Sequence, residues 1–266
     1  MSETTSAAPS TDEAPQESLR VAVLGARGRM GSEAVQAVQS APGLELVAAL
    51  GREDPLERLV ESGAQVLVDL TVPAATEDNV RFGVEHGIHC VVGATGWDDE
   101  RLARLEALLG EHPGIGVLIA PNFSIGAVLA MRFSAQAARF FESVEIVELH
   151  HPDKVDAPSG TASRTASLVA QARREAGVPA SPDATQTDPA GARGGVVDDV
   201  RVHSVRLRGL VAHQETLLGS TGEQLTIRHD SFDRVSFMSG VLLGVRTVGS
   251  RPGLTHGLDG YLDLDA

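Results

Sequence analysis

The sequence is poor in the residues from which several kinds of functional surface are built. Its 266 residues include a single cysteine, Cys90, so the chain can form neither an internal disulfide nor a cysteine-based zinc cluster. Aromatic residues make up only 3%, which leaves little material for stacking bases or sugars. No apolar run approaches the roughly 20 residues that span a bilayer, and the N-terminus lacks a secretory signal pattern. We therefore expect a cytoplasmic protein with no membrane partner.

Positive charge is also scarce. Lys and Arg number 22 against 36 Asp and Glu, so the formal net charge is −14. A chain this acidic repels the phosphate backbone of nucleic acids unless its cations are clustered, so we expect no nucleic-acid partner. With 42% apolar residues, the chain can still bury the core of one large or two modest domains.

What the sequence does contain is a regular alternation of apolar strands and amphipathic helices. Residues 1–18 are small and polar, and we expect them to form a disordered tail. From Arg20 onward, alternating strands and helices predict a doubly wound parallel α/β sheet, the Rossmann-type architecture of a dinucleotide-binding domain. Five strands are expected, at residues 20–24, 44–50, 66–70, 88–92 and 116–120.

After Asn122 this rhythm changes. Helices are expected at 124–141 and 161–176, with a strand at 143–151 between them, and three β runs follow a Pro- and Gly-rich loop at 178–199. Because short turns separate these runs, at 200–208, 211–218 and 223–229, they favour an antiparallel sheet. We predict a second α+β domain with a mixed or antiparallel sheet over residues 123–233. A last helix at 234–248 would pack back on the first domain, which then comprises residues 19–122 and 234–266.

A glycine-rich turn, GARGRMG, follows the first strand and opens the first helix. Glycines at such a turn let backbone N–H groups approach a pyrophosphate at the positive end of a helix. The GxxGxxG spacing differs from the commoner GxGxxG, and a tight turn without a ligand is the alternative interpretation. Its position in a first β–α unit favours a dinucleotide. The expected cofactor contacts here are Gly25, Ala26, Arg27, Gly28, Arg29 and Met30.

The end of the second strand bears on the choice of dinucleotide. An acidic residue at that point usually binds the ribose 2′-hydroxyl of NAD, but this chain has Gly51 and Arg52 there. We expect both NADPH and NADH to be used, with a modest preference for NADPH, because Arg52 could pair with a 2′-phosphate. Arg52 could equally be a solvated loop cation, and Glu53 or Asp54 could take the acidic role.

Two further loops follow the fourth and fifth strands, where open α/β sheets bind their ligands. Both could line the nicotinamide end through backbone groups, although each alone could be a plain turn. Their residues are Gly93, Ala94 and Thr95, and Ala120, Pro121, Asn122 and Phe123.

The most informative segment is ELHHPDKVDAPSGTA, residues 148–162, which passes from a strand through a loop into a helix. Exposed N–H groups and a hydroxyl-bearing cap at that helix start form an anion site, which suits a substrate with carboxylate groups. A lysine near a histidine and a dinucleotide could donate a proton as hydride arrives. No metal is expected, because the spacing gives no facial set of ligands; an ordinary surface loop is the other interpretation. The candidates are His150, His151, Lys154, Ser159, Gly160 and Thr161.

With GARGRMG, GATG, APNFSIG and ELHHPDKVDAPSGTA in this order, the sequence from about Arg20 to its end closely resembles the 4-hydroxy-tetrahydrodipicolinate reductase (dihydrodipicolinate reductase) family of the diaminopimelate route to lysine. The resemblance implies an oxidoreductase that reduces 4-hydroxy-tetrahydrodipicolinate to tetrahydrodipicolinate with NAD(P)H, assembled as a homotetramer through its second domain. It implies that His150 is the acid/base residue and Lys154 the proton donor. The substrate carboxylate would be held by His151, Gly160 and Thr161.

Three features depart from the family pattern: Gly51 replaces an acidic residue, Ala94 stands where Thr is usual, and an acidic tail precedes Leu19. Two other functions remain open, namely another NAD(P)-dependent dehydrogenase of an amino-acid pathway and a non-catalytic regulator that senses dinucleotides. A regulator needs no proton donor, so the combination of His150, Lys154 and an anion-binding helix start argues against it.

Overall fold

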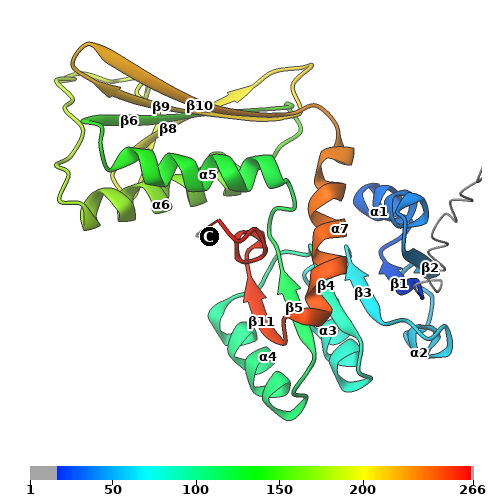
Figure 1. Cartoon of the computed structure of the whole chain (residues 1–266). Coiled ribbons are helices and arrows are strands. Elements are labelled where there is room, and N and C mark those ends of the chain that lie inside the picture. Colours follow the sequence, from blue (N-terminus) through cyan, green and yellow to red (C-terminus); the bar gives the residue numbers. More distant parts are fainter. Residues whose placement is uncertain (1–16, 265–266) are drawn as a thin grey trace, which may run out of the picture.

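The computed structural model describes residues 17–264, which fold around two β-sheets (Figure 1). Most of the tail predicted at 1–18 lies outside the described residues, and Glu17 and Ser18 have no regular secondary structure. Within residues 17–264, no helix is long and apolar enough to cross a membrane.

The first sheet has six strands in the order β11-β5-β4-β3-β1-β2, and every pair of neighbours is parallel. The prediction of a Rossmann-type sheet is therefore confirmed. The last strand in sequence, β11, was not predicted; it pairs with β5 at the sheet edge. The strands are β1 (Leu19–Leu24), β2 (Leu44–Leu50), β3 (Val66–Asp69), β4 (His89–Val92), β5 (Gly116–Ile119) and β11 (Gly253–His256).

Helices cover both faces of this sheet because its strands are apolar on both sides. On one face Val68 packs in a cluster with Val38 of α1 and Val241 of α7. On the other face Leu67 packs with residues of α2, α3 and α4, such as Leu109. The helices are α1 (Arg29–Ser40), α2 (Glu57–Glu61), α3 (Thr76–Glu85), α4 (Asp99–Glu111) and α7 (Met238–Thr247).

The second sheet has five strands in the order β10-β9-β6-β8-β7. It is mixed, because β6 and β8 run parallel while the other neighbours are antiparallel. The helices α5 and α6 lie on one face of the sheet, toward the first sheet (Figure 1). The elements are α5 (Ile125–Ala138), β6 (Ser143–His150), α6 (Gly160–Glu175), β7 (Gly195–Val197), β8 (Val200–Arg206), β9 (Ala212–Ser220) and β10 (Glu223–Ser231).

Three details differ from the sequence-based expectation. The sheet is mixed, which is one of the two predicted forms, but β8 does not pair with β9: α6 and the loop after it carry the chain across to a place parallel to β6. The loop expected at 178–199 contains the short strand β7. The helix expected at 234–248 is divided into the 3₁₀ turns η1 (Arg234–Phe237) and η2 (Val248–Ser250) on either side of α7, and a third turn, η3 (Leu258–Tyr261), follows β11.

Candidate active site

The predicted cofactor loops lie together along one edge of the first sheet. They follow the carboxyl ends of β1, β2, β4 and β5, and parallel neighbours bring these ends to the same side. The loops comprise residues 25–30, 51–52, 93–95 and 120–123. The structure therefore brings the four predicted segments to the edge where open α/β sheets bind their ligands.

The glycine loop after β1 is shaped so that only glycines fit at two of its positions. Gly25 has φ +74°, and a Cβ on Gly31 would lie 2.0 Å from the Gly25 carbonyl oxygen. Gly28 is the N-cap of α1, and among the described residues no side chain caps this helix start. The free N–H groups of its first turn and the positive helix end suit a pyrophosphate.

At the end of β2, a carboxylate does lie close to Gly51. Asp54 Oδ2 accepts a hydrogen bond from the Gly51 N–H at 2.8 Å, and the carboxylate pairs with Arg58 at 2.8 Å and with Arg27 at 3.4 Å. The Gly51 hydrogen bond, aided by the two arginines, lowers the pKa of Asp54. Arg27 and Arg58 thus offset the charge of this one carboxylate. Arg27 is exposed, and so is Arg52, which adds a further cation to the loop.

A cleft of about 550 Å³ lies between the loops that follow β4 and β5 and the helices of the second sheet. Its lining carries Arg132, Lys154 and Arg164 against Asp156 and Asp259, a local excess of cations in a chain of net charge −14. Such a cleft concentrates an anionic ligand. The predicted residues in its lining are Thr95, Pro121, Asn122, His150, Lys154, Ser159, Gly160 and Thr161.

The start of α6 forms one wall of the cleft. Ser159 caps the helix by accepting the Ala162 N–H at 3.2 Å, and a Cβ on Gly160 would meet nothing within 4 Å. Thr161 Oγ1 accepts a hydrogen bond from the Asn122 side-chain amide at 3.1 Å, which joins this wall to the loop after β5. Of the predicted substrate residues, His151 is the one that the structure places outside the cleft lining described here.

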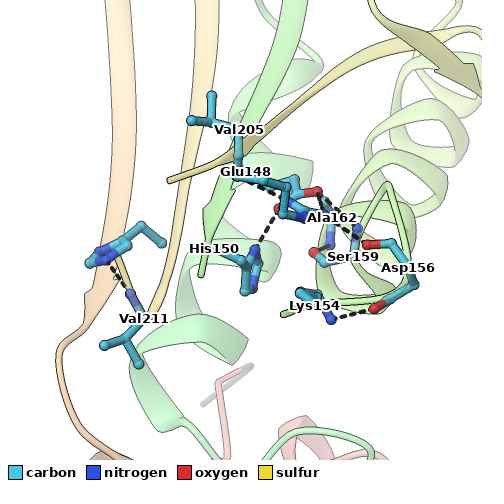
Figure 2. Close-up of polar contacts among 10 residues, drawn as sticks. Glu148, His150, Lys154, Asp156, Ser159, Ala162, Val205 and Val211 are labelled. Atoms are coloured by element: carbon cyan, nitrogen blue, oxygen red, sulfur yellow. Dashed lines mark hydrogen bonds and ion pairs between the residues drawn. The ribbon is translucent and has the colours of Figure 1, made fainter. Parts of the chain in front are cut away.

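His150 is the last residue of β6 and has a buried acidic partner (Figure 2). Its Nδ1 lies 2.5 Å from Oε2 of Glu148, whose side chain has 0% exposure. Arg206 donates to both oxygens of that carboxylate, at 2.7 and 2.9 Å. Burial would raise the pKa of Glu148, but the hydrogen bonds from His150 and Arg206 outweigh it and lower the pKa to about 2. Glu148 and Arg206 were not predicted from the sequence.

Lys154 enters the cleft from the loop between β6 and α6. Its Nζ donates to Oδ1 of Asp156 at 2.7 Å, and this hydrogen bond lowers the pKa of Asp156 (Figure 2). Both partners line the cleft with His150. Among the described residues, no group of three or more His, Cys, Asp or Glu side chains is placed to hold a metal ion.

Comparison with known proteins agrees with this geometry. The family model described as dihydrodipicolinate reductase, N-terminus, matches residues 19–123, and the model for the C-terminus of the same enzyme matches residues 126–262. The chain belongs to the dihydrodipicolinate reductase family. The resemblance inferred from its motifs is thereby confirmed, and the chain is an NAD(P)H-dependent oxidoreductase of this family.

Relatives of this family match over nearly their whole length. A protein of Streptomyces coelicolor named 4-hydroxy-tetrahydrodipicolinate reductase is 67% identical over 247 residues, 93% of this chain and 99% of that protein. One of the same name from Nocardia farcinica is 63% identical over 246 residues, 92% of this chain and 99% of that protein. A dipicolinate-bound dihydrodipicolinate reductase from Paenisporosarcina sp. TG-14 is 38% identical, with a TM-score of 0.83 over 92% of this chain and 100% of that one.

Proposed function

We propose that this chain carries out the reaction for which its relatives are named, the NAD(P)H-dependent reduction of 4-hydroxy-tetrahydrodipicolinate, at the cleft between the two sheets. The observation that carries the proposal is the cleft itself. It joins the carboxyl edge of a dinucleotide-binding sheet to an open helix start, with His150 and Lys154 between them. A ligand with carboxylate groups and a group that needs a proton would find both requirements met there.

The residues of the cleft divide the work between binding and proton transfer. The first N–H groups of α6, at Gly160 and Thr161, lie at the positive end of the helix and would hold one substrate carboxylate. Lys154 would donate a proton to the atom beside the one that is reduced, and His150 would act as acid or base at its Nε2. Asp156 holds the Lys154 ammonium in the cleft at 2.7 Å.

The residues at the sheet edge fit a nicotinamide dinucleotide. The loop at Gly25, Gly28 and Gly31 would hold the pyrophosphate, because added side chains there would fill the space or clash with backbone. When bound, the reduced nicotinamide supplies the hydride. Backbone groups at 93–95 and 120–123 would position its ring beside His150 and Lys154; the side chain of Phe123, 3% exposed, is packed in the core.

The proposed activity is tested by a single assay. The purified protein receives the product of pyruvate and aspartate-semialdehyde condensation, and oxidation of NADH or NADPH is followed by absorbance. We expect oxidation that depends on both the substrate and the protein. A protein that binds the dinucleotide but shows no turnover with this substrate would contradict the proposal and return the regulator as the better interpretation.

A valine in place of Gly160 tests the proposed carboxylate site. Because a Cβ at Gly160 meets nothing within 4 Å, the variant should fold, while its branched side chain covers the N–H groups of the helix start. We expect the substrate KM to rise by about tenfold or more, the equivalent of losing one charged hydrogen bond of roughly 1.5–3 kcal/mol, with little change in the cofactor KM. Equal changes in both constants would place the anion site elsewhere.

The choice of cofactor follows from the charges around Gly51. The Asp54 carboxylate is compensated by Arg27 and Arg58, and the adjacent exposed residues Arg52 and Glu53 are opposite in charge, so a 2′-phosphate meets little net repulsion. A charge-assisted contact is worth roughly 1.5–3 kcal/mol before solvent screening, which is strong at an open loop. We therefore propose that NADPH is used at least as well as NADH, with a modest preference.

Two substitutions at this loop should each move the ratio of kcat/KM for the two cofactors toward NADH. Gly51→Asp adds a carboxylate where the Cβ lies 3.3 Å from the Arg27 guanidinium, so it should occupy that cation and move the ratio toward NADH. Arg52→Ala should weaken NADPH selectively. A strong NADH preference that neither change alters would show that this loop does not contact the 2′-position.

We further propose a cytoplasmic homotetramer with domains at residues 19–122 with 234–266 and at 123–233. What supports the assembly is the face of the second sheet opposite α5 and α6, where Val147, Leu149, Val205 and Leu217 lie on neighbouring strands. Within the described part of the chain, no helix covers this face of the sheet (Figure 1). Light scattering during gel filtration should give the mass of four chains. Leu217→Glu should reduce that mass, and Val60→Glu, an exposed apolar position on α2, should not. A monomer in the unmodified protein would overturn the proposal.

A further inference from the structure

One buried carboxylate and its arginine partner together contact each part of the proposed proton-transfer site. Glu148 accepts His150 Nδ1 at 2.5 Å, the Ser159 N–H at the start of α6 at 3.2 Å, and both Nη atoms of Arg206. Arg206 in turn donates to the Asp156 carbonyl oxygen at 2.7 Å, in the loop that carries Lys154. The pair of Glu148 and Arg206 therefore contacts His150, the anion-binding helix start and the Lys154 loop together (Figure 2 shows Glu148 between His150 and Ser159).

We propose that Glu148 is a positioning residue for the reductase reaction: with Arg206, it fixes the ring of His150 and its tautomer, so that Nε2 is the nitrogen that exchanges a proton in the cleft. This inference rests on the proposed role of His150.

The chemistry of the carboxylate determines which nitrogen carries the fixed proton. A carboxylate with a pKa of about 2 is ionised throughout the neutral range, and an ionised carboxylate only accepts hydrogen bonds. His150 Nδ1 must therefore be the donor in their contact. The two protonation states of the ring then differ only at Nε2, which points away from Glu148.

Arg206 also offsets the free-energy cost of burying the charge of Glu148. A carboxylate with 0% exposure would be costly to bury alone, and the bidentate Arg206 contact compensates it. Its charge then acts on His150 from the buried side. Other titratable or charged groups also face His150. His213 and His229 line a second, smaller pocket with it. The cleft itself is lined by Arg132, Lys154, Asp156, Arg164, His256 and Asp259.

The first test measures the tautomer directly in the unmodified protein. ¹⁵N-labelled histidine gives ring nitrogen shifts that separate the two neutral tautomers, and the His150 signals are assigned by their loss in His150→Gln. We expect a protonated Nδ1 and an unprotonated Nε2 in the neutral ring. The opposite tautomer would overturn the proposal. This measurement requires no turnover, so it distinguishes failure of the positioning role from failure of the proposed reaction.

The second test uses two substitutions whose effects should have opposite signs. Glu148→Gln leaves Arg206 uncompensated beside His150, so the limb of the pH–kcat profile that His150 controls should move to lower pH. Arg206→Met leaves the Glu148 charge uncompensated, so the same limb should move to higher pH. We also expect kcat of Glu148→Gln to fall by about 10²-fold, the cost of misplacing a catalytic group by about 1 Å.

A matched control lies on the same strand. Glu145 makes the same kind of triad on the opposite side of β6, with Arg193 at 2.5 Å and His203 at 2.7 Å. Glu145→Gln should leave the His150 limb and the His150 tautomer unchanged. A purely structural role for Glu148 would lower kcat in both test variants without the opposite shifts, and that result would overturn the proposal. If Glu148→Gln does not fold, Arg206→Met and the tautomer measurement still decide.

Discussion

Replacing Lys154 by alanine is expected to lower kcat by about 10²–10⁴-fold, the usual contribution of a positioned proton donor, while the NAD(P)H KM stays near its original value. We expect kcat to fall without a change in the cofactor KM because the two sites are apart. Lys154 lies in the loop between β6 and α6, which lines the cleft, whereas the proposed pyrophosphate site lies at the start of α1. Since its partner Asp156 is half exposed at 48%, removing the ammonium leaves that carboxylate in contact with water and should cost little stability.

Steady-state kinetics with both substrates varied checks this expectation. Arg174→Ala is the matched control, because Arg174 is an exposed cation near the end of α6 and outside the cleft lining. We expect its kcat and both KM values to match those of the unmodified protein. Near-normal turnover of Lys154→Ala would show that the proton comes from another group, and His150 would be the next one to test.

The sequence could predict those parts of the fold in which a run of consecutive apolar residues indicates a buried strand. The first strand and its neighbours are apolar on both faces, so runs such as RVAVL indicate central parallel strands without further information. The strand β11, GLTH, is too short and too polar to stand out, because it lies at the sheet edge and pairs only with β5. The position of β11 at the edge of the sheet therefore becomes evident only in the folded structure.

The strand order of the second sheet was harder to predict, because it also depends on pairing between segments far apart in the sequence. Alternating strands with short turns favour antiparallel neighbours, and β9 and β10 do pair in this way. The pairing of β6 with β8, however, joins segments that start 57 positions apart, at Ser143 and Val200, with α6 between them. No local pattern distinguishes this parallel crossover from a hairpin.

Glu148 shows why the proton-transfer site could be predicted only in part. On an alternating strand, a glutamate is expected to face solvent. His150, two residues further along, could be predicted as a site residue because of the HHPDKVDAPSGTA segment that it begins. Glu148 is buried because Arg206 reaches it from β8, at a sequence separation of 58 residues. One signal was available: Glu148 shares the β6 face of Val144 and Ile146, so the apolar alternation itself places a charge in the core.

Replacing His150 by glutamine should give a loss comparable to that of Lys154→Ala. An amide neither accepts nor releases a proton at neutral pH, so we expect kcat to fall by about 10²–10⁴-fold and the limb of the pH profile due to the imidazole to vanish. The glutamine side-chain amide can still donate one hydrogen bond to Glu148, so the buried carboxylate keeps a partner and the fold should be retained. Unchanged pH dependence would show that His150 is not the titrating group.

The same variant shows whether Glu148 acts through His150. If Glu148 matters for turnover because it orients the ring, adding Glu148→Gln to His150→Gln should cost little further in kcat, although Glu148→Gln alone costs about 10²-fold. Residues that act as one unit show this non-additivity, while independent contributions multiply. The four proteins of the cycle are compared by kcat at one pH, with thermal unfolding to verify the fold. A double variant slower than His150→Gln by the full effect of Glu148→Gln would mean that the carboxylate serves the reaction by another route, for which its contact with Ser159 at 3.2 Å is the next candidate.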